Sequence, residues 1–94
     1  MNAECQPKLG KGVKLHRDRE GTVMLLVPEG ALTLNRVAAV ALELVDGKRT
    51  LAQIVDAVVE RFEVEPARAR EDLGGLFDRL SERRFVLREA DADG

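Results

Sequence analysis

The hydrophobic pattern of this chain changes its period once, at Asn35, and that change limits the folds open to it. Before Asn35, apolar and polar residues alternate in short runs, which is typical of half-buried β-strands. After Asn35, apolar residues recur every three or four positions, which is typical of amphipathic helices. With 94 residues, the chain has room for a single core. We therefore expect one α+β domain with its strands first and its helices second.

The first third of the chain predicts a three-stranded antiparallel meander. Three short runs are rich in apolar and β-branched residues, as a strand with one buried face requires. The glycine that closes each intervening loop can adopt a positive φ angle, and proline presets the first corner of the second loop. The expected strands are residues 13–16, 22–27 and 31–34, separated by a turn at 18–21 and a three-residue loop at 28–30.

The remainder predicts three helices, each with its own start signal. Asn35 is a suitable N-cap for the first, and Thr50 and Gln53 have the spacing of a capping box for the second. Pro66 is favoured at the first position of the third, which is expected to run to about Arg84. Gly47 suits the left-handed position after the first helix. We expect these helices to pack like a winged-helix core.

The two ends differ in composition from the middle of the chain. Residues 1–11 are polar and are expected to form a flexible N-terminal arm, whereas residues 89–94 are acidic and are expected to form a disordered tail. Residues 12–88 are then the single winged-helix-like domain. No apolar run approaches the roughly 20 residues that span a bilayer, and the N-terminus lacks a secretory apolar segment, so a cytoplasmic protein that binds no membrane is expected.

The residue inventory gives no support for catalysis or metal binding. The chain has one cysteine and one histidine, too few for a disulfide within the chain or for a zinc or iron site. His16 is expected at an exposed strand position, without a cysteine or serine near it. The formal net charge of -2 gives no electrostatic reason to expect nucleic acid. We expect no enzyme and no cofactor.

Binding is the remaining class of function. A short sheet has edge strands with unpaired N–H and C=O groups, and the strand Ala31-Leu32-Thr33-Leu34 contains no charge or proline that would block the addition of another strand. An extended peptide could join it by β-augmentation. The same pattern is also consistent with an edge that another element of the chain covers.

An ordered series of motifs resembles the PqqD family of pyrroloquinoline quinone (PQQ) biosynthesis. The run MLLVPEGALTLN (residues 24–35) is followed by DGKRT (46–50) and by Ile54-Val55, and residues 7–18 are similar to the family's first strand. The acidic start of the third helix, with Leu73, Leu76, Phe77 and Leu80 after it, fits as well. The resemblance covers about residues 7–87.

The resemblance implies a RiPP recognition element, a winged-helix-like module that binds a ribosomal precursor peptide. Here the peptide would be PqqA, and the module, a peptide chaperone, would present it to the radical S-adenosylmethionine enzyme PqqE. The peptide is expected as an added strand beside the third strand, in a groove closed by the third helix. Carried over to this chain, the implied contact surface is Ala31, Leu32, Thr33 and Leu34, and the implied groove wall is Leu73, Leu76, Phe77 and Leu80.

Three questions stay open at the level of sequence. Gly74-Gly75 stands where relatives more often carry larger residues, which predicts a shallower groove or a more pliable helix. Both a monomer and a homodimer, including one that exchanges the third helix, are consistent with the pattern. The alternative functions are a small winged-helix DNA-binding regulator, supported by the local basic patch of Arg79, Arg83, Arg84 and Arg88, and a domain that docks only onto a partner enzyme.

Overall fold

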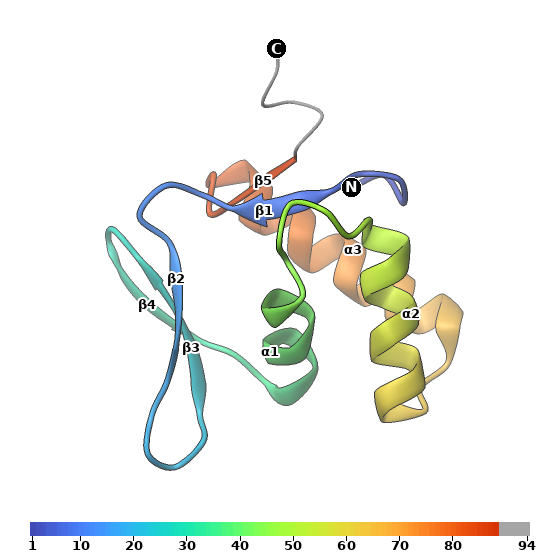
Figure 1. Cartoon of the computed structure of the whole chain (residues 1–94), viewed down its shortest axis with the longest axis horizontal. Coiled ribbons are helices and arrows are strands. Elements are labelled where there is room, and N and C mark those ends of the chain that lie inside the picture. Colours follow the sequence, from blue (N-terminus) through green and yellow to red (C-terminus); the bar gives the residue numbers. More distant parts are fainter. Residues whose placement is uncertain (89–94) are drawn as a thin grey trace.

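Two antiparallel sheets and three helices make up the structure, a computed structural model that describes residues 1–88 (Figure 1). The larger sheet has the strand order β2-β3-β4, and the smaller sheet pairs β1 with β5. The expected tail at residues 89–94 lies outside the described residues. The elements are β1 (Pro7–Leu9), β2 (Lys14–Arg17), β3 (Val23–Val27), β4 (Gly30–Thr33), α1 (Arg36–Glu43), α2 (Leu51–Phe62), α3 (Pro66–Glu82) and β5 (Val86–Arg88).

The predicted meander is confirmed, with one correction to its second loop. Strand β2 pairs with β3, and β3 with β4, both antiparallel. The turn at 18–21 is closed by Gly21, whose φ of 88° is in the left-handed region. The register pairs Val27 with Gly30, so the second loop contains two residues, Pro28 and Glu29, and not three. Gly30 therefore belongs to β4 because it already pairs with β3.

The three helix starts are confirmed in detail. The Asn35 side chain accepts the N–H of Ala38 at 2.7 Å, and Thr50 and Gln53 form both hydrogen bonds of a capping box. Pro66 occupies the first turn of α3. The expected end of the first helix was wrong, because α1 stops at Glu43 and is capped by Leu44 in a right-handed conformation. The third helix likewise ends at Glu82, two residues before the expected boundary.

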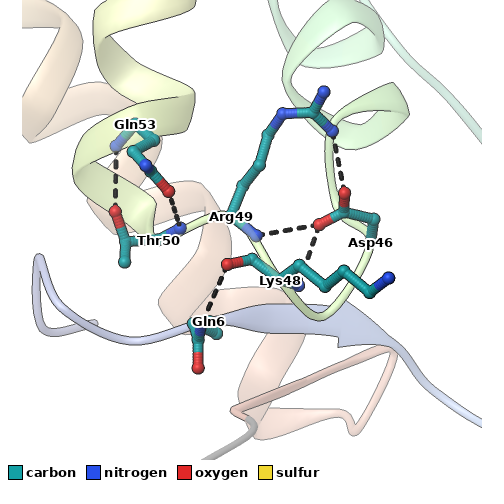
Figure 2. Close-up of polar contacts among 6 residues, drawn as sticks. All are labelled: Gln6, Asp46, Lys48, Arg49, Thr50 and Gln53. Atoms are coloured by element: carbon teal, nitrogen blue, oxygen red, sulfur yellow. Dashed lines mark hydrogen bonds and ion pairs between the residues drawn. The ribbon is translucent and has the colours of Figure 1, made fainter.

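The DGKRT segment forms a turn of its own between α1 and α2 (Figure 2). The Asp46 carboxylate accepts the backbone N–H groups of Lys48 and Arg49, each at 2.9 Å, and also pairs with the Arg49 guanidinium. These backbone hydrogen bonds, with that from Arg49 first, lower the pKa of Asp46 because they stabilise the charged form. The turn ends at Thr50, the N-cap of α2. The DGKRT motif therefore has a structural role, because it connects α1 to the start of α2.

The N-terminal segment is part of the fold and not an arm outside it. Strand β1 pairs with β5 in the register of Lys8 with Leu87, and the Cys5 side chain is buried. The carbonyl groups of Ala3 and Cys5 accept N–H groups from the start of α2 at 2.9 and 2.8 Å. The ordered domain therefore begins well before residue 12. Three-residue strands are too short to produce a periodic signal, and their pairing joins opposite ends of the chain, which explains the error.

The core lies where α2 and α3 pack against each other, with α1 packed between α2 and strand β3 of the larger sheet. It is mainly aliphatic, with Phe77 fully buried at its centre. Leu25 of β3 is also fully buried and belongs to the same core cluster. The other large side chains at the centre are Leu42, Ile54, Val58 and Val86. Helix α3 is thereby held by its apolar stripe, which leaves its opposite face available.

The smaller sheet predicts a specific sensitivity at Gly10. Its N–H donates to the Phe85 carbonyl at 2.8 Å, and a Cβ atom built there would lie 2.1 Å from the Arg84 carbonyl oxygen. We expect Gly10→Ala to destabilise the protein by roughly 1–3 kcal/mol, because two backbones would have to separate. Gly74→Ala is the matched control: a Cβ atom there meets nothing within 4 Å, and a helical alanine stabilises by about 1 kcal/mol relative to glycine.

Urea denaturation of the two variants and the parent chain measures both effects. An unchanged or increased stability for Gly10→Ala would contradict the close pairing of β1 with β5.

Candidate functional site

Strand β4 leaves one hydrogen-bonding edge of the larger sheet without a partner. The N–H of Leu34 donates to the Val23 carbonyl at 3.1 Å. Because pairing directions alternate along an antiparallel strand, Leu32 also directs its backbone groups toward β3, whereas Ala31 and Thr33 direct theirs away from the sheet. Within residues 1–88, no backbone hydrogen bond from another loop or element reaches Ala31 or Thr33. The edge can therefore accept an additional strand through these two residues.

The opposite edge of the same sheet is less suitable for an added strand. Strand β2 has the sequence KLHR, so three of its four residues have cationic or titratable side chains. Charged side chains along an edge oppose the addition of another strand. Strand β4 has the sequence GALT, which contains no charge. The composition of the two edges therefore favours β4. His16 is exposed on β2, as its alternation with apolar neighbours predicted.

Leu32 combines a core-facing position with unusual exposure. It is paired with the fully buried Leu25, so both side chains lie on the inner face of the sheet. The Leu32 side chain nevertheless remains 40% exposed. Among the large hydrophobic residues of the described part of the chain, it is the one classed as exposed. Its position at the edge explains this, because no further strand covers its outer side. A strand added to β4 would cover apolar surface here.

A hollow of about 870 Å³ lies between the start of α1 and the exposed side of α3. We call it the apolar hollow, because Val37, Val64, Leu73 and Leu76 line it. It begins at Asn35, two residues beyond the end of β4, so it continues the line of the open edge. Its rim is charged and consists of Glu65, Arg68, Glu71, Asp72 and Arg79.

The structure separates the four α3 residues that were expected to line a groove. Leu76 is half-buried and lines the apolar hollow, and Leu73 lines it with its small exposed portion of 2%. Phe77 and Leu80 are 0% and 6% exposed and belong to the core cluster, and neither lines the hollow. The helical period explains this division, because residues 73, 77 and 80 follow the buried stripe and residue 76 lies at its margin. The sequence showed the stripe but not which margin faces the hollow.

The glycine pair of α3 faces open space. A Cβ atom at Gly74 would meet nothing within 4 Å, and one at Gly75 would meet only the Arg79 guanidinium at 3.8 Å. No close backbone approach therefore requires glycine at either position. Gly75 lines the apolar hollow, so the missing side chain adds to its space. The expectation of a shallower groove or a more pliable helix stays a prediction.

A second hollow, of about 370 Å³, lies at the other end of β4. It is lined by the loop residues Pro28 and Glu29, and by residues before β2 and after α3. We call it the basic hollow, because Lys11, Arg83 and Arg84 line it. The basic patch expected from the sequence is therefore divided, since Arg79 lines the apolar hollow instead.

The two hollows lie near opposite ends of β4 and at opposite ends of α3. An extended chain from residue 29 to residue 35 covers about 20 Å, and the helix from residue 72 to residue 83 covers about 16 Å. The two distances are similar. The loop before β4 and the end of α3 line the basic hollow together, whereas Asn35, just after β4, lines the apolar hollow together with the first half of α3. Strand and helix thus run in opposite directions past a site about six residues long. Lys11, Val37 and Val64 were missed by sequence reasoning because only tertiary contacts bring them to this site.

The described residues offer no arrangement for metal chemistry. Within residues 1–88, no three His, Cys, Asp or Glu side chains are placed so that they could hold a metal ion. The side chain of Cys5 is buried within the N-terminal segment. None of the helices in this part of the chain has both the length and the apolar character needed to cross a bilayer. The open edge and its two hollows are therefore the feature from which a function can be argued.

Comparison with known proteins identifies relatives along nearly the whole chain. Residues 22–86 match the family described as coenzyme PQQ synthesis protein D (PqqD). A PqqA binding protein of Xanthomonas euvesicatoria is 35% identical over 87 residues, which cover 92% of this chain and 95% of the relative. A PqqA binding protein of Rhizobium meliloti is 34% identical, over 84% of this chain and 82% of the relative.

A solved structure confirms the fold. It is the solution NMR structure of the PqqD portion of Methylobacterium extorquens PqqCD, described as a functional, stand-alone RiPP recognition element. The TM-score is 0.74 with 31% sequence identity, and the match covers 87% of this chain and 88% of the other. The α+β architecture expected from the sequence is thus shared with a protein of known structure.

The edge position of Leu32 leads to a prediction about stability. We expect Leu32→Ala to lower the free energy of unfolding by less than about 1 kcal/mol, because much of the side chain is already in water. Leu25→Ala, at the paired position on β3, removes a fully buried side chain and should cost about 2–5 kcal/mol. Thermal and urea denaturation of both variants test this. Equal losses would mean that Leu32 is a core residue and not part of an open surface.

Proposed function

The chain belongs to the PqqD family, and we propose that it is a non-catalytic peptide chaperone that binds the precursor peptide PqqA and presents it to the radical S-adenosylmethionine enzyme PqqE. The observation that carries the proposal is the uncovered edge of β4 beside the apolar hollow. The names of the relatives support PqqA as the ligand. The proposal includes a cytoplasmic location, where ribosomal peptides are made.

The free backbone groups of β4 determine how the peptide would be held. Ala31 and Thr33 each have an N–H donor and a C=O acceptor that face away from β3, so an added strand would form up to four main-chain hydrogen bonds. Main-chain bonds provide affinity with little dependence on sequence, whereas adjacent pockets provide preference. Leu32, between the two residues, would be covered by the peptide's own side chains.

The apolar hollow would provide the preference for sequence. Val37, Val64 and Leu76 present apolar surface at the end of β4, and the absence of a side chain at Gly75 leaves room beside them. A large apolar side chain of the peptide would fill this space and remove both surfaces from water. Of the groove wall expected from the resemblance, the proposal keeps Leu73 and Leu76. It omits Phe77 and Leu80, because they are buried in the core.

A function without catalysis fits the residues around the edge. The backbone provides the main-chain contacts, and the side chains nearest to them are those of Ala31, Leu32, Thr33 and Leu34, which include no acid, base or thiol. Among residues 1–88, no side chain that could act as a base forms a hydrogen bond with the Thr33 hydroxyl. The crosslinking chemistry would belong to PqqE, and the present chain would supply a bound, extended substrate.

Titration of the isotope-labelled chain with PqqA, followed by amide chemical shifts, tests the proposal. We expect the largest shifts at Ala31 and Thr33 of β4, and at Gly75 and Leu76 of α3. The titration is repeated with PqqE present, because the partner enzyme is part of the proposed complex. Shifts restricted to other surfaces, or none under both conditions, would refute the peptide-chaperone function.

Proline substitutions separate the edge from the interior of the sheet. Thr33→Pro removes an outward N–H and should weaken PqqA binding roughly tenfold with little loss of fold, because edge strands tolerate proline where the N–H faces solvent. Arg17→Pro removes an outward donor from the opposite edge, β2, and should leave the affinity unchanged.

Leu32→Pro is a poor test, because the Leu32 N–H faces β3 and its loss would disrupt the sheet itself. Isothermal titration calorimetry measures the affinity for PqqA, and circular dichroism measures whether each variant keeps its fold. Equal affinities for Thr33→Pro and the parent chain would exclude β4 as the binding edge.

A further inference from the structure

Three cationic side chains converge beside the start of β4, although they come from distant parts of the sequence. Lys11 precedes β2, whereas Arg83 and Arg84 follow α3, and all three line the basic hollow. Each of the three residues is exposed. Among residues 1–88, the acidic residue that lines this hollow is Glu29, in the loop before β4. The hollow therefore has an excess of positive charge in a chain whose net charge is negative.

These cations are not neutralised by the described part of the chain. Ion pairs of arginine side chains within residues 1–88 include those of Arg17 with Glu43, Arg49 with Asp46 and Arg68 with Asp72. The side chains of Lys11, Arg83 and Arg84 form no ion pair with any residue of 1–88. An anionic group that entered the hollow would thus meet three cations that no other residue of 1–88 neutralises.

The backbone that carries the cations is fixed by the smaller sheet. Arg84 has a φ of 62° and donates its N–H to the Ser81 carbonyl at 3.0 Å, which turns the chain from α3 toward β5. Its carbonyl lies against Gly10, whose own N–H is bonded to Phe85. Lys11 follows Gly10 directly. The same close backbone pairing therefore holds Lys11 and Arg84 on one side of the hollow.

The other end of β4 has the opposite character. The apolar hollow has three carboxylates and two arginines on its rim, and Arg68 is paired with Asp72 at 3.7 Å. Glu65 and Glu71 form no ion pair among residues 1–88, whereas Arg79 lies over Gly75. A peptide strand along β4 would thus meet cations at one end and an apolar surface with a slightly acidic rim at the other.

From this asymmetry we infer that the basic hollow binds an acidic stretch of the peptide and that charge determines which way round the peptide lies on β4. The inference rests on the proposed function, because the peptide is the one that β4 would hold. Backbone hydrogen bonds alone allow a strand to bind in either direction, since both edges of a strand offer alternating donors and acceptors. An acidic segment about six residues from an apolar anchor fits the site in only one orientation, because the reverse would place carboxylates against Glu65 and Glu71.

Charge reversal at the end of α3 is the first test. Arg83→Glu/Arg84→Glu should weaken binding of PqqA by tenfold or more at about 50 mM NaCl, because two favourable charge contacts become repulsive. At about 500 mM NaCl, where the Debye length is only roughly 4 Å, the difference should fall to about twofold. Arg19→Glu/Arg70→Glu is the control: it makes the same change in net charge, and neither residue lines a hollow. Its affinity should stay within about twofold of the parent at both salt concentrations.

A gain of affinity is the second test, and misfolding cannot imitate it. Glu29→Gln removes the one carboxylate that residues 1–88 contribute to the basic hollow and should tighten binding of PqqA two- to fivefold at low salt. A PqqA peptide with its Asp and Glu residues replaced by Asn and Gln should bind the parent, the Glu29→Gln variant and the Arg83→Glu/Arg84→Glu variant with equal affinity. Fluorescence anisotropy of a labelled peptide measures all of these constants.

The outcomes separate the inference from the function on which it rests. Tight binding of PqqA that is indifferent to Arg83, Arg84 and Glu29 would overturn the inference and leave the peptide-chaperone function intact. Absence of PqqA binding by the parent chain, with PqqE absent and present, would overturn both. Binding of a short DNA duplex that depends on Arg83 and Arg84, together with indifference of the peptide to them, would also overturn the inference and would favour a nucleic-acid partner.

Discussion

The pairing of β4 with β3 is the interaction on which the candidate site depends. Its register directs the backbone groups of Leu32 and Leu34 into the sheet and those of Ala31 and Thr33 out of it. A shift of one residue would reverse this arrangement and would also turn Leu32 from the inner face to the outer face. The register is fixed by the two-residue loop at Pro28-Glu29 and by the burial of Leu25 opposite Leu32. The open edge is thus a consequence of how the core is packed.

Helix α3 has two roles that the helical period keeps apart. Phe77 and Leu80 are buried in the core and hold the helix in place, whereas Leu76 and Gly75 line the apolar hollow. A helix anchored by one stripe can present its margin to a ligand without loss of packing. Gly75 fits this division, because it lines the apolar hollow and a Cβ atom there would meet only the Arg79 side chain. Glycine at this position costs about 1 kcal/mol of helix stability relative to alanine. No close approach of another backbone requires glycine there, which is consistent with a role in the groove.

The smaller sheet links the stability of the domain to the charge at the site. Pairing of β1 with β5 brings residue 10 against residue 84, and so places a lysine from the N-terminal segment beside two arginines from the end of α3. The basic hollow therefore depends on this pairing. The segment expected to be an arm is therefore part of the surface that we infer to orient the peptide.

The sequence by itself determined the type and order of most elements, because these depend on local physics. The change of period at Asn35, the Thr50 capping box and the position of Pro66 each act within a few residues, and each is confirmed. The uncharged composition of residues 31–34 likewise identified the edge with the least obstacle to another strand. Only the tertiary structure decided that β1 pairs with β5, that Phe77 faces the core while Leu76 faces the hollow, and that Lys11 lies with Arg83 and Arg84. These features join residues as much as 81 positions apart, from Pro7 to Arg88, and local propensity has no information about contacts that form only when the core closes.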